Sequence, residues 1–252
     1  MNMLNTKVLI TGGSRGLGLG VVEALVARHA NVTVLARDPA RLAELEARLG
    51  VSVIAGDATD PALAESVLRE LRPGVLVLNA GATPMMAPLH EQTWESFSAI
   101  WNNDVKATFH WVQSALRLPL EGGTRVLISS SGAALQGSPL SGGYAGAKRM
   151  IWLMAEYANG IANELGLGIR FQALLLQQIL GATDLGRAAA EAYARRKGVS
   201  SEAFLAGFGK SLDARGYGEH VVTLLTDPRY ESATAFGIRG ETGIRPLTVA
   251  PM

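Results

Sequence analysis

KVLITGGSRGLG, residues 7–18, is the stretch that decides the fold of this chain. Its apolar start predicts a buried strand, and the residues after Gly18 follow a helical pattern as far as Arg28. A strand, a glycine-rich turn and a helix start together make a phosphate site. Glycines let the backbone approach a pyrophosphate, and free N–H groups at the helix N-terminus face its charge. An ordinary glycine turn is the alternative, but the strand and helix on either side favour the phosphate site. The residues expected to hold the phosphates are Gly12, Ser14, Arg15, Gly16, Leu17 and Gly18.

Short apolar runs and helical patterns alternate from this stretch to the end of the chain. The expected strands are residues 7–11, 31–36, 51–55, 75–78, 124–131, 169–175 and 233–238, and the main expected helices are residues 19–28, 39–49, 92–117, 142–165 and 219–226. This alternation predicts an α/β fold in a single domain, with a doubly wound parallel sheet and helices on both faces. Residues 177–212 are the least regular part, and we expect one or two short helices there that form a substrate lid.

The composition excludes several classes of protein. Of the 252 residues, 48% are hydrophobic and 18% are charged, which allows a substantial core. The net charge is +1 without a basic block, which argues against a nucleic-acid partner. There is no cysteine and the four histidines are scattered, so neither a disulfide nor a metal site is predicted. No apolar run reaches the roughly 18–20 residues of a membrane span, and strand-like sequence begins at Lys7, which leaves no room for a signal peptide. We therefore expect a soluble, cytoplasmic protein.

The end of the second expected strand indicates which cofactor binds. A dinucleotide-binding fold that prefers NAD usually places an acid there to hold the ribose 2′-hydroxyl. The sequence here reads Leu35-Ala36-Arg37, and a guanidinium suits a 2′-phosphate. Arg15 in the glycine turn is placed to approach the same phosphate. We therefore expect NADP rather than NAD. Asp38 argues slightly against this, and two solvated arginines are the alternative.

The ends of the third and fourth expected strands complete the cofactor site. Asp57, followed by Ala58, is placed to bond the adenine ring, and an ordinary loop acid is the equal alternative. Asn79, Ala80 and Gly81 follow the fourth strand. Small residues at that position leave space for a cofactor that lies across the strand ends.

Tyr144 and Lys148 are expected to carry the chemistry. They stand four residues apart in an expected helix, so both side chains lie on one face. A phenol has an ordinary pKa of about 10 and a neighbouring ammonium lowers it, so such a pair suits general acid and base work. The pair alone is weak evidence, because a half-buried tyrosine beside a solvated lysine has the same spacing. Three hydroxyls end the fifth strand, where Ser129 and Ser131 share one face and Ser130 opposes them.

Assembled in this order, these residues resemble the short-chain dehydrogenase/reductase family over nearly the whole chain. The resemblance is carried by the glycine-rich turn, Asp57, residues 79–81, the serine strand and the tyrosine–lysine pair. It implies a Rossmann fold with a seven-stranded parallel sheet, a nicotinamide cofactor, and hydride transfer between an alcohol and a carbonyl. The family's catalytic serine falls thirteen places before the tyrosine, which is Ser131 here, with Ser130 as the alternative.

The resemblance also implies a role for each catalytic residue. Tyr144 exchanges a proton with the substrate oxygen, and Ser131 donates a hydrogen bond to that oxygen, where charge develops. Lys148 lowers the pKa of the phenol beside it and bonds the nicotinamide ribose.

Two positions depart from the family's pattern. The family usually has an asparagine in the long helix, joined to the lysine through water, and the alignment puts Asp104 there, with Asn103 as the alternative. After the sixth strand the family often has Pro-Gly, whose loop meets the nicotinamide carboxamide, and this chain has Leu176-Gln177.

Together, these expectations favour an NADP-dependent alcohol dehydrogenase or carbonyl reductase that acts on a medium-sized, largely uncharged small molecule. The alternative from another class is an NADP-binding sensor or scaffold with little turnover, which the two departures support. A sugar epimerase or dehydratase is disfavoured, since only about 40 residues follow Leu212. Aromatic residues on more than one face of residues 92–117 predict a homodimer or homotetramer.

Overall fold

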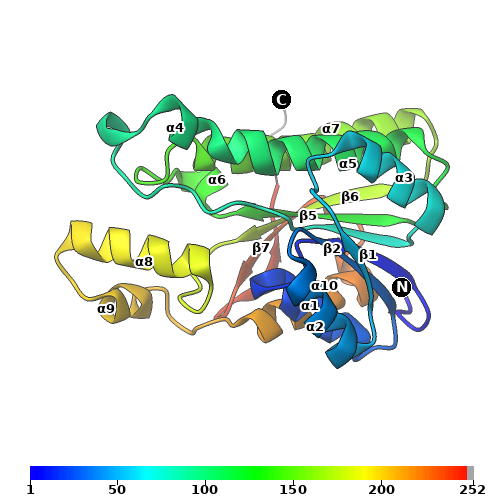
Figure 1. The fold of residues 1–252 in the computed structure, drawn as a ribbon, viewed down its shortest axis with the longest axis horizontal. Coiled ribbons are helices and arrows are strands. Elements are labelled where there is room, and N and C mark those ends of the chain that lie inside the picture. The colour runs from blue at the N-terminus through cyan, green and yellow to red at the C-terminus, as the bar shows by residue number, and fades with distance from the viewer. Residues whose placement is uncertain (249–252) are drawn as a thin grey trace.

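Parallel strands form the middle layer of the molecule (Figure 1) in the computed structural model, which describes residues 1–248. The strands follow the order β3-β2-β1-β4-β5-β6-β7-β8 along the sheet. Their bounds are β1 Lys7–Thr11, β2 Asn31–Ala36, β3 Ser52–Ala55, β4 Val75–Leu78, β5 Arg125–Ser131, β6 Arg170–Leu176, β7 Ala235–Arg239 and β8 Gly243–Pro246. The predicted doubly wound parallel sheet is confirmed for β1 to β7. Because the strand order reverses between β1 and β4, a crevice is expected at the carboxyl ends of these two strands.

The seven predicted parallel strands are present, and an eighth strand that the sequence did not predict extends the sheet in the described part of the chain. β8 pairs antiparallel with β7, and Ile244 lies opposite Ile238. Gly243, with a φ of 65°, stands at the end of the tight turn that reverses the chain. The strand reads GIRP, with no apolar run and a proline at its end, so its sequence carries no strand signal.

Helices cover both faces of the sheet. In Figure 1, α1, α2 and α10 lie on one face and α3, α5 and α7 on the other, whereas α8 and α9 project beyond the sheet. The helix bounds are α1 Gly16–Val26, α2 Pro39–Leu49, α3 Pro61–Leu71, α4 Trp94–Ile100, α5 Lys106–Arg117, α6 Ala133–Gln136, α7 Tyr144–Glu164, α8 Asp184–Lys197, α9 Ser201–Ala206 and α10 Ala214–Thr226. Two hydrophobic clusters, one on each face of the sheet, fill the space between the layers. Within residues 1–248, each helix is too short or too polar to span a membrane.

The long helix expected at residues 92–117 is interrupted in the structure. After α4 the chain passes through a π-helical turn at Trp101–Val105 before α5 begins. Such a turn carries extra residues in the helical path, and it often marks a functional site. It contains Asp104 and packs against α7, so it brings this carboxylate toward the expected catalytic helix.

Glycines decide how closely α10 lies against α1. A Cβ atom at Gly20 would overlap the carbonyl of Ala214, and one at Gly218 would overlap the carbonyl of Gly20. The two helices therefore meet backbone to backbone, which only glycine permits. This contact holds α1 in place, and α1 starts at the end of the glycine-rich turn.

Candidate active site

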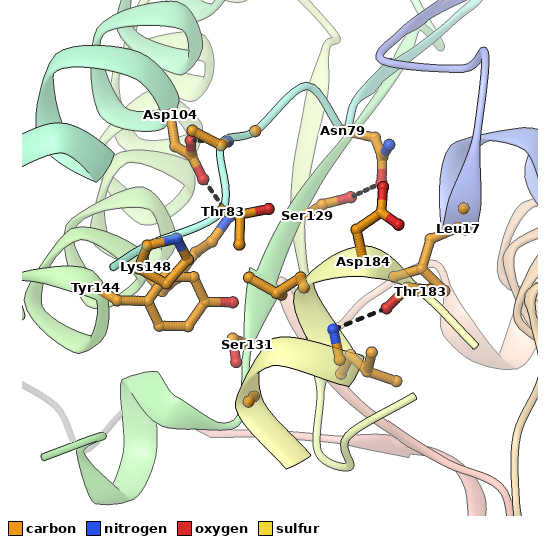
Figure 2. A pocket seen from close by; sticks show the side chains of 18 of the residues that line it. Leu17, Asn79, Thr83, Asp104, Ser129, Ser131, Tyr144, Lys148, Thr183 and Asp184 are labelled. Atoms are coloured by element: carbon orange, nitrogen blue, oxygen red, sulfur yellow. Dashed lines mark hydrogen bonds and ion pairs between the residues drawn. The ribbon is translucent and has the colours of Figure 1, made fainter. Parts of the chain in front are cut away.

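A cleft of about 1100 Å³ opens at the carboxyl ends of the central strands. It is lined by the glycine-rich turn, the residues that follow β2 to β6, the start of α7 and the segment that contains α8 and α9. Figure 2 shows the part of the cleft between Leu17, Tyr144 and Thr183. The predicted cofactor and catalytic residues all line this cleft, with the exception of Gly18. The structure thus brings together residues that lie far apart in the sequence.

Close backbone contacts explain two of the glycines in the turn. Gly12 has a φ of 70°, and a Cβ atom there would lie 2.7 Å from the Cα atom of Ala80. A Cβ atom at Gly18 would overlap the carbonyl of Gly12, so Gly18 packs beneath the turn rather than lining the cleft. Thr11 Oγ1 accepts hydrogen bonds from the N–H groups of Asn79 (3.1 Å) and Ala80 (3.2 Å), which ties the end of β1 to the end of β4.

The N-terminus of α1 suits a phosphate group. Arg15, the residue before the helix, is extended and makes no side-chain cap, and the first turn of α1 holds no acidic side chain. The first N–H groups and the positive end of the helix dipole therefore have no anionic partner from α1 itself. Together with the glycines that admit a close approach, this arrangement fits the pyrophosphate of a dinucleotide.

Arginines gather where a cofactor's ribose would lie. Arg37, directly after β2, and Arg41 of α2 both line the cleft. Asp38, which argued against NADP, caps the N-terminus of α2 with its carboxylate and pairs with Arg41 at 3.2 Å. Arg15 also lines the cleft, where its guanidinium pairs with Asp184 of α8 at 2.7 Å. Arg37 therefore has a clearer path to a 2′-phosphate than Arg15.

Asp57 shapes the loop after β3. Its carboxylate accepts the N–H of Thr59 at 2.8 Å. This backbone bond, with a smaller contribution from the positive charge of Arg37, holds the pKa of Asp57 below its ordinary value. Asp57 lines the cleft, and its bond to an adenine ring stays a prediction.

Tyr144 and Lys148 lie side by side at the start of α7 (Figure 2), with the lysine Nζ 5.7 Å from the centre of the phenol ring. Lys148 Nζ also pairs with Asp104 Oδ2 at 2.9 Å, and the two side chains are only 11% and 2% exposed. Burial is the largest single effect on the pKa of Lys148 and lowers it. The charge and hydrogen bond of Asp104, with smaller contributions from Tyr144 and Tyr217, together outweigh burial, so the pKa lies above its ordinary value. The lysine is therefore charged at neutral pH beside the phenol.

Of the two residues that align with the family's asparagine, Asp104 is the one that reaches Lys148. Its second carboxylate oxygen accepts the N–H of Ala82 at 2.8 Å. A Cβ atom at Gly81 would lie 2.8 Å from Asp104 Oδ2, so glycine makes room for the carboxylate. The amide of Asn103 turns away and donates to the carbonyl of Ala99 at 2.7 Å.

The three serines at the end of β5 have different hydrogen-bond partners. Ser130 Oγ is buried and donates to the carbonyl of Lys148 at 2.8 Å, which anchors α7 to the sheet. Ser129 Oγ donates to Asn79 Oδ1 at 3.2 Å, across to the end of β4. Ser131 is half-buried in the cleft near the phenol (Figure 2), where its Oγ accepts a backbone N–H of the turn that follows. Ser131 is thus the serine whose hydroxyl hydrogen has no bond to another described residue.

Several cleft residues were missed by the sequence analysis. The hydroxyl of Tyr193 in α8 lies 2.8 Å from Ser138 Oγ, a contact between residues too distant in sequence to form a local pattern. Thr183 caps α8 through its Oγ1, and a threonine before an acid at a helix start is a signal that could have found it. Gln177, by contrast, was singled out in the sequence as a departure from the family's pattern, and it lines the cleft directly after β6.

Comparison with known proteins agrees with this geometry. The model of the short chain dehydrogenase family matches residues 6–194. A short chain dehydrogenase/reductase of Aspergillus aculeatus is 33% identical over 156 residues, which are 58% of this chain and 55% of that protein. A cis-2,3-dihydrobiphenyl-2,3-diol dehydrogenase of Paraburkholderia xenovorans is 32% identical over 177 residues, which are 64% of this chain and 63% of that protein. An L-xylulose reductase of Mesocricetus auratus is 29% identical over 118 residues, which are 46% of this chain and 48% of that protein. The matches thus span less than two thirds of the length of each of these relatives.

A solved structure shares the architecture. An NAD+-bound xylitol dehydrogenase superposes with a TM-score of 0.83 and 20% identity, over 95% of this chain and 100% of that chain. At this identity the agreement concerns the fold alone.

Proposed function

This chain belongs to the short chain dehydrogenase family, and from that premise we propose that it is an NADP-dependent oxidoreductase with an alcohol or carbonyl substrate. The observation that carries the proposal is the charged Lys148 beside Tyr144 in a cleft whose other end is a glycine-rich phosphate site. When bound, the reduced nicotinamide supplies a hydride to a carbonyl carbon, and the oxidised ring takes one from an alcohol. The nicotinamide itself is expected near Tyr144, since the cleft runs from Arg37 to that residue.

The chain's own residues handle the proton. In carbonyl reduction, the Tyr144 phenol gives its proton to the substrate oxygen as the hydride arrives at carbon, and in alcohol oxidation the phenolate takes it back. The half-buried hydroxyl of Ser131 donates a hydrogen bond to the same oxygen, where negative charge develops. The buried ammonium of Lys148 favours the phenolate, and Asp104 holds that ammonium in place.

NADP is favoured over NAD by the arginines at the ribose end of the cleft. Arg37 is exposed there, and its planar fork suits a 2′-phosphate. The carboxylate of Asp38, which follows it, already caps α2 and pairs with Arg41. It is therefore less available to accept a hydrogen bond from a ribose hydroxyl.

We further propose that the segment 177–212 acts as a lid. The Arg15–Asp184 ion pair joins this segment to the glycine-rich turn across the cleft. Both side chains are more than half exposed, so the pair is weak and can open to admit a cofactor.

A homodimer or homotetramer is supported by apolar side chains on the face formed by α4, α5 and α7. Trp94 is 73% exposed and Phe109 is 47% exposed, and Tyr157 and Ile161 of α7 and Leu165, directly after it, are also exposed. A groove of about 490 Å³ between α4 and the start of α7 runs through the same face. A second copy of the chain would bury this surface.

The direct test is NADPH oxidation with a panel of ketones and aldehydes. We expect turnover by the native chain and loss of most turnover in Tyr144→Phe, with NADPH binding largely kept, because only the transferable proton is removed. Near-full rates in this variant would refute the proton role. Tight NADPH binding without turnover on any member of the panel would favour the alternative, a nucleotide-binding sensor or scaffold.

A further inference from the structure

Three aromatic rings form one cluster on the α8–α9 side of the cleft. The ring of Tyr193 in α8 stacks on that of Phe204 in α9, with centroids 6.0 Å apart and planes 12° apart. Phe208 meets Phe204 edge to face at 5.5 Å and 82°. All three line the cleft and are only half-buried. The cluster therefore presents aromatic surface to whatever enters.

The cluster is held in place from the opposite wall. The hydroxyl of Tyr193 lies 2.8 Å from Ser138 Oγ, and Ser141 Oγ donates to Ser138 Oγ at 2.6 Å. These serines precede α7, so the bonds link the α8–α9 segment to the helix that carries the catalytic tyrosine. The ammonium of Lys197 lies 5.2 Å from the centre of the Phe204 ring. Rings fixed in this way lose little freedom when a ligand binds, which favours affinity.

The polar groups of this part of the cleft are mostly engaged with one another. Gln178 Oε1 accepts the N–H of Gly240 at 2.6 Å, and the serine hydroxyls bond within the Tyr193 group. Among the described residues, the side-chain amides of Gln136 and Gln177 are the lining amides that make no hydrogen bond within the protein. A substrate with several hydroxyl groups would leave some of them unpaired on burial, which is costly.

The geometry points to a planar aromatic carbonyl compound as the substrate class, with its ring packed against Phe204 and Phe208; this rests on the reduction proposed above. Aromatic pairs prefer offset-stacked and edge-to-face contacts, and the cluster offers both a ring face and ring edges. Met86, which lines the same cleft from the loop after β4, adds a flexible thioether that packs well on aromatic rings. The carbonyl oxygen would then lie at Tyr144 and Ser131.

A matched pair of ketones tests the class. 2-Tetralone and 2-decalone share one carbon skeleton, and neither carbonyl is conjugated to a ring, so they differ mainly in the aromatic ring. We expect kcat/KM to be about ten-fold higher for 2-tetralone, from the added aromatic contacts. An open-chain ketopentose serves as the polyol-like comparison and should be the poorest of the three.

Two variants locate the effect. Phe204→Leu and Phe208→Leu, each checked for folding by circular dichroism, should bring the 2-tetralone to 2-decalone ratio down to about two or less, because an aliphatic side chain packs similarly on both. Glu202→Gln, an exposed change in the same short helix as Phe204, should leave the ratio unchanged. A ratio that is the same in both leucine variants as in the native chain would overturn the assignment to this cluster.

Ligand binding tests the aromatic site independently of the proposed reduction. Calorimetric titration of 2-naphthol and of decahydro-2-naphthol into the protein saturated with NADPH, which cannot oxidise either ligand, should show about ten-fold tighter binding of the aromatic ligand. If that holds while no ketone is reduced, the aromatic site stands and the reductase proposal fails. If 2-decalone or the ketopentose is reduced with the same kcat/KM as 2-tetralone, the reductase proposal stands and the aromatic site is refuted.

Discussion

The buried pair between Asp104 and Lys148 allows a sharp prediction for Asp104→Asn. The variant keeps an oxygen for the N–H of Ala82 but leaves the Lys148 ammonium buried without a counter-charge. Unit charges at the observed 2.9 Å attract by about 6 kcal/mol at an effective dielectric of 20. Burial offsets part of this attraction, and breaking such a pair by removing one partner costs about 3–5 kcal/mol. Because the amide preserves one hydrogen bond, we expect a loss of about 3 kcal/mol in unfolding free energy at neutral pH.

The pH dependence distinguishes the charge from the hydrogen bond. In the native chain the pKa of Lys148 is raised, so the stabilisation is complete below the unfolded value of about 10.4 and is lost only as pH rises through the still higher folded value. Without the carboxylate, burial, the largest effect on Lys148, is opposed only by the smaller contributions of Tyr144 and Tyr217, so we expect the pKa of Lys148 to fall below the unfolded value. The free energy of unfolding of the variant then rises relative to that of the native chain as pH rises toward 10. The difference in unfolding free energy between the two proteins therefore becomes smaller.

Urea unfolding at about pH 7 and about pH 10 measures this difference directly. Glu44→Gln removes an exposed carboxylate from α2 and serves as the control. We expect it to change the free energy of unfolding by nearly zero at both pH values. A loss that is equal at the two pH values for Asp104→Asn would refute the charge argument. It would assign the whole effect to packing or to the bond with Ala82.

Three further predictions follow from the cleft and the exposed face. Arg37→Asp should weaken NADP binding at least ten-fold in titration and shift the preference toward NAD, because it replaces a guanidinium that binds the 2′-phosphate with a carboxylate that accepts a hydrogen bond from the ribose 2′-hydroxyl. Equal binding of NAD and NADP by the native chain would contradict the cofactor assignment. Ser131→Ala should lower kcat by about 10²–10³ with little change in melting temperature. Ser130→Ala should mainly lower stability, by about 1 kcal/mol, because it removes the buried side-chain hydrogen bond to the Lys148 carbonyl; the reverse pattern would move the catalytic role to Ser130. Phe109→Asp, at an exposed position of the proposed interface, should shift the chain toward the monomer in light scattering at micromolar concentration; a native chain that is already monomeric would refute the proposed assembly.

Local sequence was enough for the elements whose signals are local. The run 7–18 predicted the first strand, the turn and the start of α1, because a buried parallel strand is a short apolar run and a tight turn needs glycine. The alternation of strands and helices determined the parallel sheet in the same way. β8 was missed because its four residues contain no apolar run and end in proline, so the pairing with β7 that makes GIRP a strand is a tertiary contact.

The candidate site shows the same division. Residue types and their spacing predicted the tyrosine–lysine pair, and the alignment left Asp104 and Asn103 as equal alternatives. Only the π-helical turn decided between them, because one residue more or less in a helical turn rotates a side chain to another face. It points Asp104 at Lys148 and Asn103 at Ala99. Likewise, the link from Ser138 to Tyr193 and the aromatic cluster beside it exist only because the fold brings α8 and α9 over the ends of the strands. Local sequence determines which elements form, and their packing determines which side chains meet.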